Sequence, residues 1–162
     1  MTGEFAPVAD LSKHRQVNRR IYSVGYEGLE VAGLIERLLS AGVNLLVDVR
    51  LNAISRKPGY SKKALSAQLE AAGIEYRHEA ALGNPPDNRD SFRRGDGEVG
   101  RLRMREILMN GSGPALRRLV EDTRHSRVAV LCVERGPKSC HREVITEMAQ
   151  ELDSAIDVLQ IL

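Results

Sequence analysis

Two short apolar runs constrain the fold of this chain more than any other feature of its sequence. Residues 128–133 read VAVLCV, and residues 45–49 read LLVDV. Short runs that are apolar at nearly every position, rather than at alternate positions, are typical of strands buried on both faces, as in parallel sheets. Parallel strands need long crossover connections, which are usually helices. The chain is therefore expected to alternate strands with helices.

Apolar residues at helical spacing lie in the segments between these runs. The first predicted helix places Val31, Leu34 and Leu38 on one face and ends at Gly42. Further helices are predicted after Ser61, over residues 98–109 and 114–124, and from Ser139, which is expected to be an N-cap. Additional short strands are predicted at residues 21–24, 74–77 and 158–162, and a long irregular loop at residues 78–97.

This alternation predicts an α/β fold with a mostly parallel sheet flanked by helices on both faces, as in a Rossmann-like three-layer sandwich. A chain of 162 residues is consistent with a single domain. The domain is expected to span residues 19–162, after a flexible N-terminal tail over residues 1–18 that shows no apolar period.

Composition gives only broad limits on location and partners. The chain has two cysteines, no apolar run of 18 residues and no charged start followed by an apolar stretch, so a cytoplasmic protein without a membrane partner is expected. The net charge of +2 permits an anionic partner without requiring one. The aromatic content of 4% argues against a surface built mainly for base stacking. The sequence does not specify an oligomeric state.

Polar residues gather where the predicted parallel strands end, which is where such sheets bind their ligands. Four strand ends contribute: Gly25 and Tyr26, then Asp48 and Arg50, then His78 and Gly83, and finally Cys132, Glu134, Cys140, His141 and Arg142. Because the carboxyl ends of parallel strands meet at one edge of a sheet, these residues are expected to form one polar rim.

Asp48 and Arg50 are separated by two positions on a strand, so both are expected on the same side of it. Together they could hold a planar anion or position a general base. The alternative is an ion pair that secures the following loop. Arg56 lies in that loop and would add a second guanidinium to the rim, unless it is a solvated surface residue.

The second polar group combines thiols, an imidazole and a carboxylate. Cys132 and Glu134 are expected to share one side of their strand. Cys140, His141 and Arg142 are predicted in the first turn of a helix, where free N–H groups attract anions and lower the pKa of a thiol. The alternative is structural, with Cys132 packed as a small apolar side chain and Arg142 paired with Glu134.

Cys132, Cys140 and His141 also supply three possible zinc ligands. Their spacing matches neither a zinc ribbon nor a zinc finger, and a second cysteine pair is missing, so no metal or other cofactor is expected, with zinc kept as an alternative. A disulfide between the two cysteines is also possible, although the expected compartment argues against it.

Several of these residues occur in an order that resembles the domain-of-unknown-function 488 family. The matching segments are Ser23-Val24-Gly25-Tyr26, Asp48-Val49-Arg50, Ser55-Arg56, Tyr76, Leu82-Gly83, Cys132-Val133-Glu134 and Cys140-His141-Arg142. The resemblance covers roughly residues 21–149. It implies an α/β domain and supports these residues as the site, but it implies no reaction. Asn84 stands where the family often has a second Gly after the Leu-Gly pair.

These observations predict a site that binds a phosphate-bearing or other anionic substrate, for example a nucleotide or nucleic acid. The candidate catalytic residues are Asp48, Glu134, Cys140 and His141. The candidate substrate-binding residues are Gly25, Tyr26, Arg50, Arg56, Tyr76, Gly83, Cys132 and Arg142. One alternative is a non-catalytic module that binds nucleic acid or a small anion through residues 89–105 and the tail. Another is a thiol redox sensor that uses Cys132 and Cys140.

Overall fold

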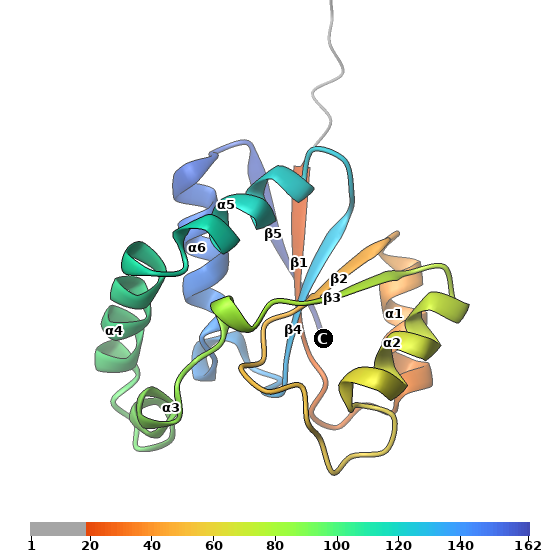
Figure 1. Ribbon diagram of the computed structural model, residues 1–162, viewed down its shortest axis with the longest axis horizontal. Helices are drawn as coiled ribbons and strands as arrows, with labels where there is room; N and C mark the ends of the chain where they lie inside the picture. Colours follow the sequence, from red (N-terminus) through yellow and green to blue (C-terminus); the bar gives the residue numbers. More distant parts are fainter. Residues whose placement is uncertain (1–18) are drawn as a thin grey trace, which may run out of the picture.

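All five strands of the central sheet run parallel, in the order β3-β2-β4-β1-β5 (Figure 1). The computed structural model describes residues 19–162, so the predicted tail over residues 1–18 lies outside the described part of the chain. The strands are β1 (Arg19–Gly25), β2 (Leu45–Asp48), β3 (Glu75–His78), β4 (Val128–Cys132) and β5 (Ile156–Ile161).

Helices connect each strand to the next. They are α1 (Val31–Ser40), α2 (Lys62–Ala71), α3 (Pro86–Arg93), α4 (Gly97–Asn110), α5 (Gly113–Asp122) and α6 (Arg142–Leu152), with the short 3-10 helices η1 (Ala80–Leu82) and η2 (Pro137–Ser139). Within residues 19–162, no helix combines the length and the apolar character that crossing a membrane requires.

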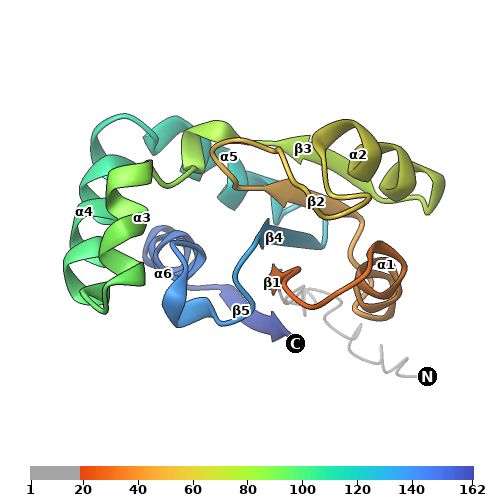
Figure 2. The same cartoon turned by 90° about the horizontal axis from the view of Figure 1, so that it is seen from below.

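Alternating strand residues face two separate apolar cores. Val128 and Val130 pack with residues of α4, α5 and α6 on one face of the sheet. Ala129 and Leu131 pack with residues of α1 and α2 on the other face. Figures 1 and 2 show α1 and α2 on one side of the sheet and α3, α4 and α6 on the opposite side. The predicted three-layer α/β sandwich is therefore confirmed.

The connections leave the sheet in two directions. The chain passes through α1 and α2 toward β3 at one edge, and it returns through α3, α4, α5 and α6 toward β5 at the other edge. Loops that leave neighbouring strands in opposite directions open a crevice at the carboxyl ends of those strands. The loops after β2 and β4 diverge in this way, which places the crevice beside Asp48 and Cys132.

The prediction of an irregular loop over residues 78–97 is wrong, because η1 and α3 lie within it. Helix α3 has only one buried residue, Asn88, and therefore shows no apolar period. It is held instead by polar contacts, since the Asn88 amide donates to Asn84 Oδ1 at 2.8 Å and to the Gly100 carbonyl at 3.0 Å. Hydrophobic spacing could not reveal a helix of this kind.

The predicted start of the last helix at Ser139 is also wrong. Ser139 belongs to η2, Cys140 has an extended backbone, and His141 is the N-cap of α6. The Ser139 hydroxyl donates to the Gly136 carbonyl at 3.0 Å and so closes the short turn instead of capping α6. Cys140 and His141 therefore precede the helix rather than occupying its first turn.

Candidate functional site

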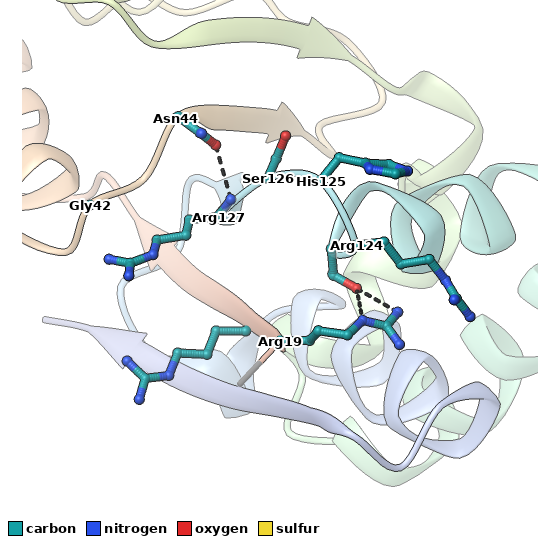
Figure 3. A pocket seen from close by; sticks show the side chains of 9 residues that line it. Arg19, Gly42, Asn44, Arg124, His125, Ser126 and Arg127 are labelled. Atoms are coloured by element: carbon teal, nitrogen blue, oxygen red, sulfur yellow. Dashed lines mark hydrogen bonds between the residues drawn. The ribbon is translucent and has the colours of Figure 1, made fainter. Parts of the chain in front are cut away.

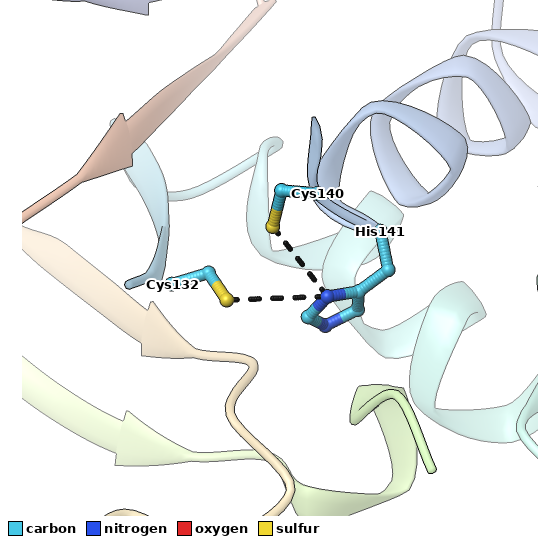
Figure 4. Close-up of side chains that lie close together, drawn as sticks. All are labelled: Cys132, Cys140 and His141. Carbon is cyan, nitrogen blue, oxygen red and sulfur yellow. Dashed lines mark hydrogen bonds between the residues drawn. The ribbon is translucent and has the colours of Figure 1, made fainter. Parts of the chain in front are cut away.

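Two thiols and an imidazole meet at the carboxyl end of β4 (Figure 4). His141 Nδ1 lies 3.5 Å from Cys140 Sγ and 3.9 Å from Cys132 Sγ. The three atoms all lie within 4.8 Å of one another, and all three residues are buried. Both cysteines are free thiols. We refer to Cys132, Cys140 and His141 as the Cys-His cluster.

The orientation of the His141 ring is set by β2. Its Nε2 lies 2.9 Å from the carbonyl oxygen of Val49. Because a carbonyl can only accept, Nε2 must carry the proton of this bond. A neutral ring then presents the lone pair of Nδ1 to the two sulfur atoms. One backbone carbonyl therefore holds the imidazole with its basic nitrogen toward the thiols.

Glu134 places a carboxylate beside the cluster. The Cys132 thiol donates to Glu134 Oε2 at 3.0 Å, which confirms that these two side chains share a side. No ion pair involves the Glu134 carboxylate within residues 19–162. The alternative in which Arg142 pairs with this carboxylate is wrong, because the Arg142 guanidinium donates to the backbone carbonyl of Glu134 instead.

Burial and mutual contacts perturb the acidity of these groups. The hydrogen bond with Cys140, together with burial, raises the pKa of Cys132 well above its ordinary value. Burial also raises the pKa of Glu134, but the Cys132 hydrogen bond and further hydrogen bonds outweigh it, so this pKa is lowered overall. Burial lowers the pKa of His141, but contact with Cys132 outweighs it, so this pKa is raised.

The loop that carries Glu134 is held by the end of β1. The backbone N–H of Tyr26 donates to the Cys132 carbonyl at 3.1 Å, and that of Glu27 donates to the Val133 carbonyl at 2.9 Å. A Cβ on Gly25 would lie 1.8 Å from the Glu134 carbonyl oxygen, so only glycine permits this approach. Gly25, a predicted substrate-binding residue, thus contributes through close backbone packing.

Arg142 is fully buried and also binds the backbone of this loop. Its guanidinium donates to the Ser23 hydroxyl at 2.9 Å and to the Glu134 carbonyl at 2.7 Å. Its backbone N–H points at Cys140 Sγ at 3.5 Å. These contacts use the guanidinium inside the protein, and Arg142 does not line the cleft described below.

Asp48 and Arg50 form a second buried network, on the other face of the sheet. Arg50 donates from Nε to Asp48 Oδ1 at 2.8 Å and from Nη2 to Asp48 Oδ2 at 2.6 Å. Tyr76 donates to Asp48 Oδ2 at 2.6 Å, and Arg50 also donates to the Tyr60 carbonyl at 2.8 Å. Burial and the bond to Asp48 raise the pKa of Tyr76. The carboxylate of Asp48 is therefore fully hydrogen-bonded and turned away from the Cys-His cluster.

Of the remaining predicted residues, only Tyr26 contacts that second network. The rings of Tyr26 and Tyr60 stack with centroids 4.1 Å apart, and the Tyr26 hydroxyl lies 3.3 Å from Arg50 Nη1. Gly83 packs against the backbone of Leu51, where a Cβ would approach to 2.5 Å. Arg56 is exposed and does not line the cleft.

A cleft opens beside the Cys-His cluster. It consists of two pockets of about 100 and 160 Å³ that share four lining residues: Asn84, Arg89, Glu134 and His141. Cys132 and Arg50 line the first pocket, and Cys140 and Phe92 line the second. Four of the predicted site residues, namely Glu134 and the three members of the Cys-His cluster, are thus brought together at one cavity.

Asn84 was not among the predicted site residues, and Arg89 was included only in the segment 89–105 of the alternative binding module. Asn84 is buried and uses Oδ1 to accept from Asn88, which leaves its amide nitrogen for a ligand. Arg89 has a buried Nε without a hydrogen-bond partner, and none of the ion pairs within residues 19–162 includes it. The signal that could have found them is the Gly-Asn-Pro-Pro run at residues 83–86, which follows η1 and leads into α3.

A larger pocket lies at the opposite end of the strands (Figure 3). It has a volume of about 460 Å³, and its lining includes Arg19, Arg20, Arg124 and Arg127. Arg19 and Arg124 are both paired with Asp153, and Arg20 Nε is buried without a partner among the described residues. The lining contains neither a thiol nor a carboxylate, so this pocket offers positive charge without the groups that surround the Cys-His cluster.

Comparison with known proteins gives one match. The family model described as "Domain of unknown function DUF488" matches residues 30–149. No curated protein and no solved structure matches the chain.

Proposed function

The chain belongs to the DUF488 family, and we propose that it is an enzyme that acts on a small anionic group held in the cleft beside the Cys-His cluster. The observation that carries the proposal is an unpaired carboxylate and an unpaired guanidinium at one small cavity. Glu134 and Arg89 both line the two pockets, and neither is neutralised by another described side chain. Such a pair suits proton transfer at one point and anion binding at another.

Arg89 is the proposed anion-binding residue. Its guanidinium can donate forked hydrogen bonds to a phosphate or a carboxylate. Asn84 would add an amide N–H on the same wall. Arg50 and Arg142, the arginines singled out from the sequence, are assigned structural roles instead, because their donors already serve Asp48, Ser23 and backbone carbonyls.

The size of the cleft limits what it can enclose. Pockets of about 100 and 160 Å³ are smaller than the range of about 300–1,000 Å³ that is typical for whole drug-sized ligands. The cleft therefore suits one phosphate or carboxylate with the bond next to it. A larger substrate, such as a nucleotide, would place the rest of its structure on the surface outside.

Glu134 is the proposed general base. Its hydrogen bond from Cys132 and its lowered pKa keep the carboxyl ionised at neutral pH, which is the form that accepts a proton. It lies beside the cleft rather than inside a closed network, in contrast to Asp48. Asp48 is therefore left out of the proposed catalytic set.

The first experiment measures binding of inorganic phosphate and phenyl phosphate by calorimetry to the full chain and to Arg89→Ala. Loss of charged hydrogen bonds should weaken binding at least about tenfold. Arg94→Ala is the matched control, because Arg94 is exposed at the end of the same helix and does not line the cleft. Equal affinities for the wild type and Arg89→Ala would refute the proposed anion site.

The second experiment measures hydrolysis of p-nitrophenyl phosphate and of its diester. Glu134→Gln keeps the shape of the side chain but cannot accept a proton, so turnover should fall by about 10²- to 10⁴-fold while phosphate binding persists. A variant that retains full turnover would remove Glu134 from the mechanism. Binding without any turnover by the wild type would favour a non-catalytic module.

The arginine-lined pocket of Figure 3 favours such a module as the second candidate. A nucleic-acid or anion-binding role there predicts an affinity that falls steeply with salt. It also predicts that Arg20→Ala weakens binding while Arg89→Ala does not. The reverse pattern would assign the anion site to the cleft.

The close approach of the two sulfur atoms, within 4.8 Å, supports a thiol redox sensor as a further alternative. That role predicts reversible loss of both free thiols on treatment with diamide. It predicts no effect of Arg89→Ala on the oxidation, since Arg89 makes no contact with either sulfur among the described residues. Thiols that remain free under oxidant would rule it out.

A further inference from the structure

We propose that the Cys-His cluster binds one Zn²⁺ ion through Cys132 Sγ, Cys140 Sγ and His141 Nδ1. Sulfur and imidazole ligands are the set that zinc prefers in proteins. The three atoms converge from the end of β4, from the residue after η2 and from the N-cap of α6. Binding of the ion itself needs no substrate, whereas the role given to it below rests on the proposed function.

The distances between the ligand atoms fit a tetrahedral ion. With bonds of about 2.3 Å to sulfur and about 2.0 Å to nitrogen, zinc holds a sulfur and a nitrogen ligand about 3.5 Å apart and two sulfur ligands about 3.8 Å apart. The observed separations between sulfur and Nδ1 are 3.5 and 3.9 Å, and the sulfur atoms lie within 4.8 Å of each other. Only small side-chain adjustments are needed to close the site.

Backbone groups around the Cys-His cluster orient its ligand atoms, as neighbouring groups do in known metal sites of proteins. A ligating histidine donates its other ring N–H to a carboxylate or a carbonyl, which fixes the ring and its tautomer. His141 makes this bond to the Val49 carbonyl at 2.9 Å, with Nδ1 turned to the sulfur atoms. The Arg142 backbone N–H points at Cys140 Sγ at 3.5 Å, as expected beside a thiolate ligand. The imidazole and one sulfur are thus held in place by the backbone.

Three protein ligands leave one coordination position for water or substrate, as in catalytic zinc sites. Each member of the Cys-His cluster lines one or both of the pockets that form the cleft, so the cleft is the side from which water would enter. Zinc lowers the pKa of bound water to about 7. Glu134 and Arg89 line both of these pockets, so a zinc-bound water would lie in the same cleft as the carboxylate of Glu134 and the anion proposed at Arg89.

The test is a titration of the reduced full chain with Co²⁺, in the presence of a phosphine reductant so that no disulfide can form. Cobalt takes the same ligands as zinc and, unlike zinc, absorbs visible light. We expect one Co²⁺ per chain, with thiolate-to-cobalt charge-transfer bands and the d–d bands of a tetrahedral site, both removed by stoichiometric Zn²⁺. Absence of these bands with saturating Co²⁺ would overturn the proposal, and this readout needs no variant.

Variants then assign the ligands. Cys140→Ser and His141→Gln should each lower the affinity for Zn²⁺ at least about tenfold against a chromophoric chelator. His125→Ala is the control, because this exposed histidine lines the pocket at the opposite end of the strands and should leave the affinity unchanged. Circular dichroism verifies that each variant is folded. Wild-type affinity in a folded Cys140→Ser chain would also overturn the site.

The outcome is separable from that of the proposed function. Zinc binding without any effect of Arg89→Ala on phosphate affinity would keep the metal site and refute the anion site. Phosphate binding that depends on Arg89 in a chain that shows no cobalt bands would keep the anion site and refute the metal site. Glu134→Gln is expected to keep zinc within about tenfold of the wild-type affinity, since Glu134 is not one of the three ligands.

Discussion

Arg142 carries a positive charge inside the protein without a carboxylate beside it among the described residues. Its guanidinium is solvated by the Ser23 hydroxyl and by the carbonyls of Glu134 and Arg135. A buried charge is tolerated only when its donors are satisfied in this way. The residue therefore acts as a clamp that ties β1 and α6 to the loop after β4. Arg50 plays the corresponding part for the loop after β2, with the difference that its charge is paired with Asp48.

The burial of Tyr60 is expected to make the stability of the protein depend on pH. Its ring is fully buried, its hydroxyl donates to the Leu29 carbonyl at 3.0 Å, and burial raises its pKa to about 12. Between pH 10 and pH 12 the phenol ionises in the unfolded chain but not in the folded one. The stability that Tyr60 contributes is therefore complete below pH 10 and is lost as the pH rises toward 12. Over this range the free energy of unfolding should fall by up to about 1.4 kcal/mol per pH unit from this group.

Urea denaturation of the wild type and Tyr60→Phe between pH 8 and pH 11 measures this contribution. The variant should be less stable by about 1 kcal/mol at pH 8, because it lacks the bond to Leu29. The difference should shrink or reverse at pH 11. Parallel pH profiles for the two proteins would contradict the assignment.

Among the elements, the turn after β1 governs the position of the site. Gly25 ends β1 against the backbone of residues 134 and 135, and the next two N–H groups bond to the last residue of β4 and the first residue of the following loop. The loop that carries Glu134 is thus positioned by a strand more than 100 residues away in the sequence. The position of this loop therefore depends on glycine at position 25, because any side chain there would collide with the loop.

Gly25→Ala should move this loop and destabilise the protein by about 1–3 kcal/mol or more, since the new Cβ would lie 1.8 Å from the Glu134 carbonyl oxygen. The same variant should lose Zn²⁺ affinity, because Cys132 is paired with Gly25 in the sheet and directly precedes the displaced loop. Gly33→Ala is the matched control. Its Cβ would meet nothing closer than 3.7 Å in helix α1, so it should stabilise the protein by about 0.5–1 kcal/mol. Both values come from urea denaturation, and a Gly25→Ala protein as stable as the wild type would contradict the argument.

At the scale of the whole molecule, one sheet joins two apolar cores. The four tyrosines, Tyr22, Tyr26, Tyr60 and Tyr76, all lie in or against the core that faces α1 and α2. The other core, under α4, α5 and α6, contains no tyrosine. Tyrosine fluorescence therefore reports one face of the sheet, while far-ultraviolet circular dichroism reports the entire fold.

Leu119→Ala removes a fully buried side chain from the core without tyrosines and should cost about 2–5 kcal/mol. If the two cores unfold as one cooperative unit, the urea midpoints by fluorescence and by circular dichroism should fall together. Leu102→Ala, at an exposed position of α4, should leave both midpoints unchanged. A fluorescence midpoint that stays at the wild-type value would show that the two faces unfold separately.

The local sequence pattern alone was sufficient to predict the architecture and part of the site. The continuous apolar runs predicted parallel strands, and alternation within a strand predicted that Cys132 and Glu134 share a side, as their contact confirms. Both inferences depend only on the repeat of the strand, which neighbouring residues determine. Helix α3 and its contributions to the cleft were missed, because polar contacts hold that helix and no apolar period marks it.

The relation between strands was decided only by the tertiary structure. Asp48 lies opposite Leu131 in the register of β2 and β4, so it faces α1 and α2, whereas Cys132 faces α6. The polar rim expected from the sequence is therefore two networks on opposite faces. Likewise, η2 folds Cys140 back onto Cys132, which no cysteine spacing predicts. Strand register and the path of the loop after β4 both depend on how segments far apart in the sequence pack together. That packing is determined by the complete core rather than by the local sequence pattern.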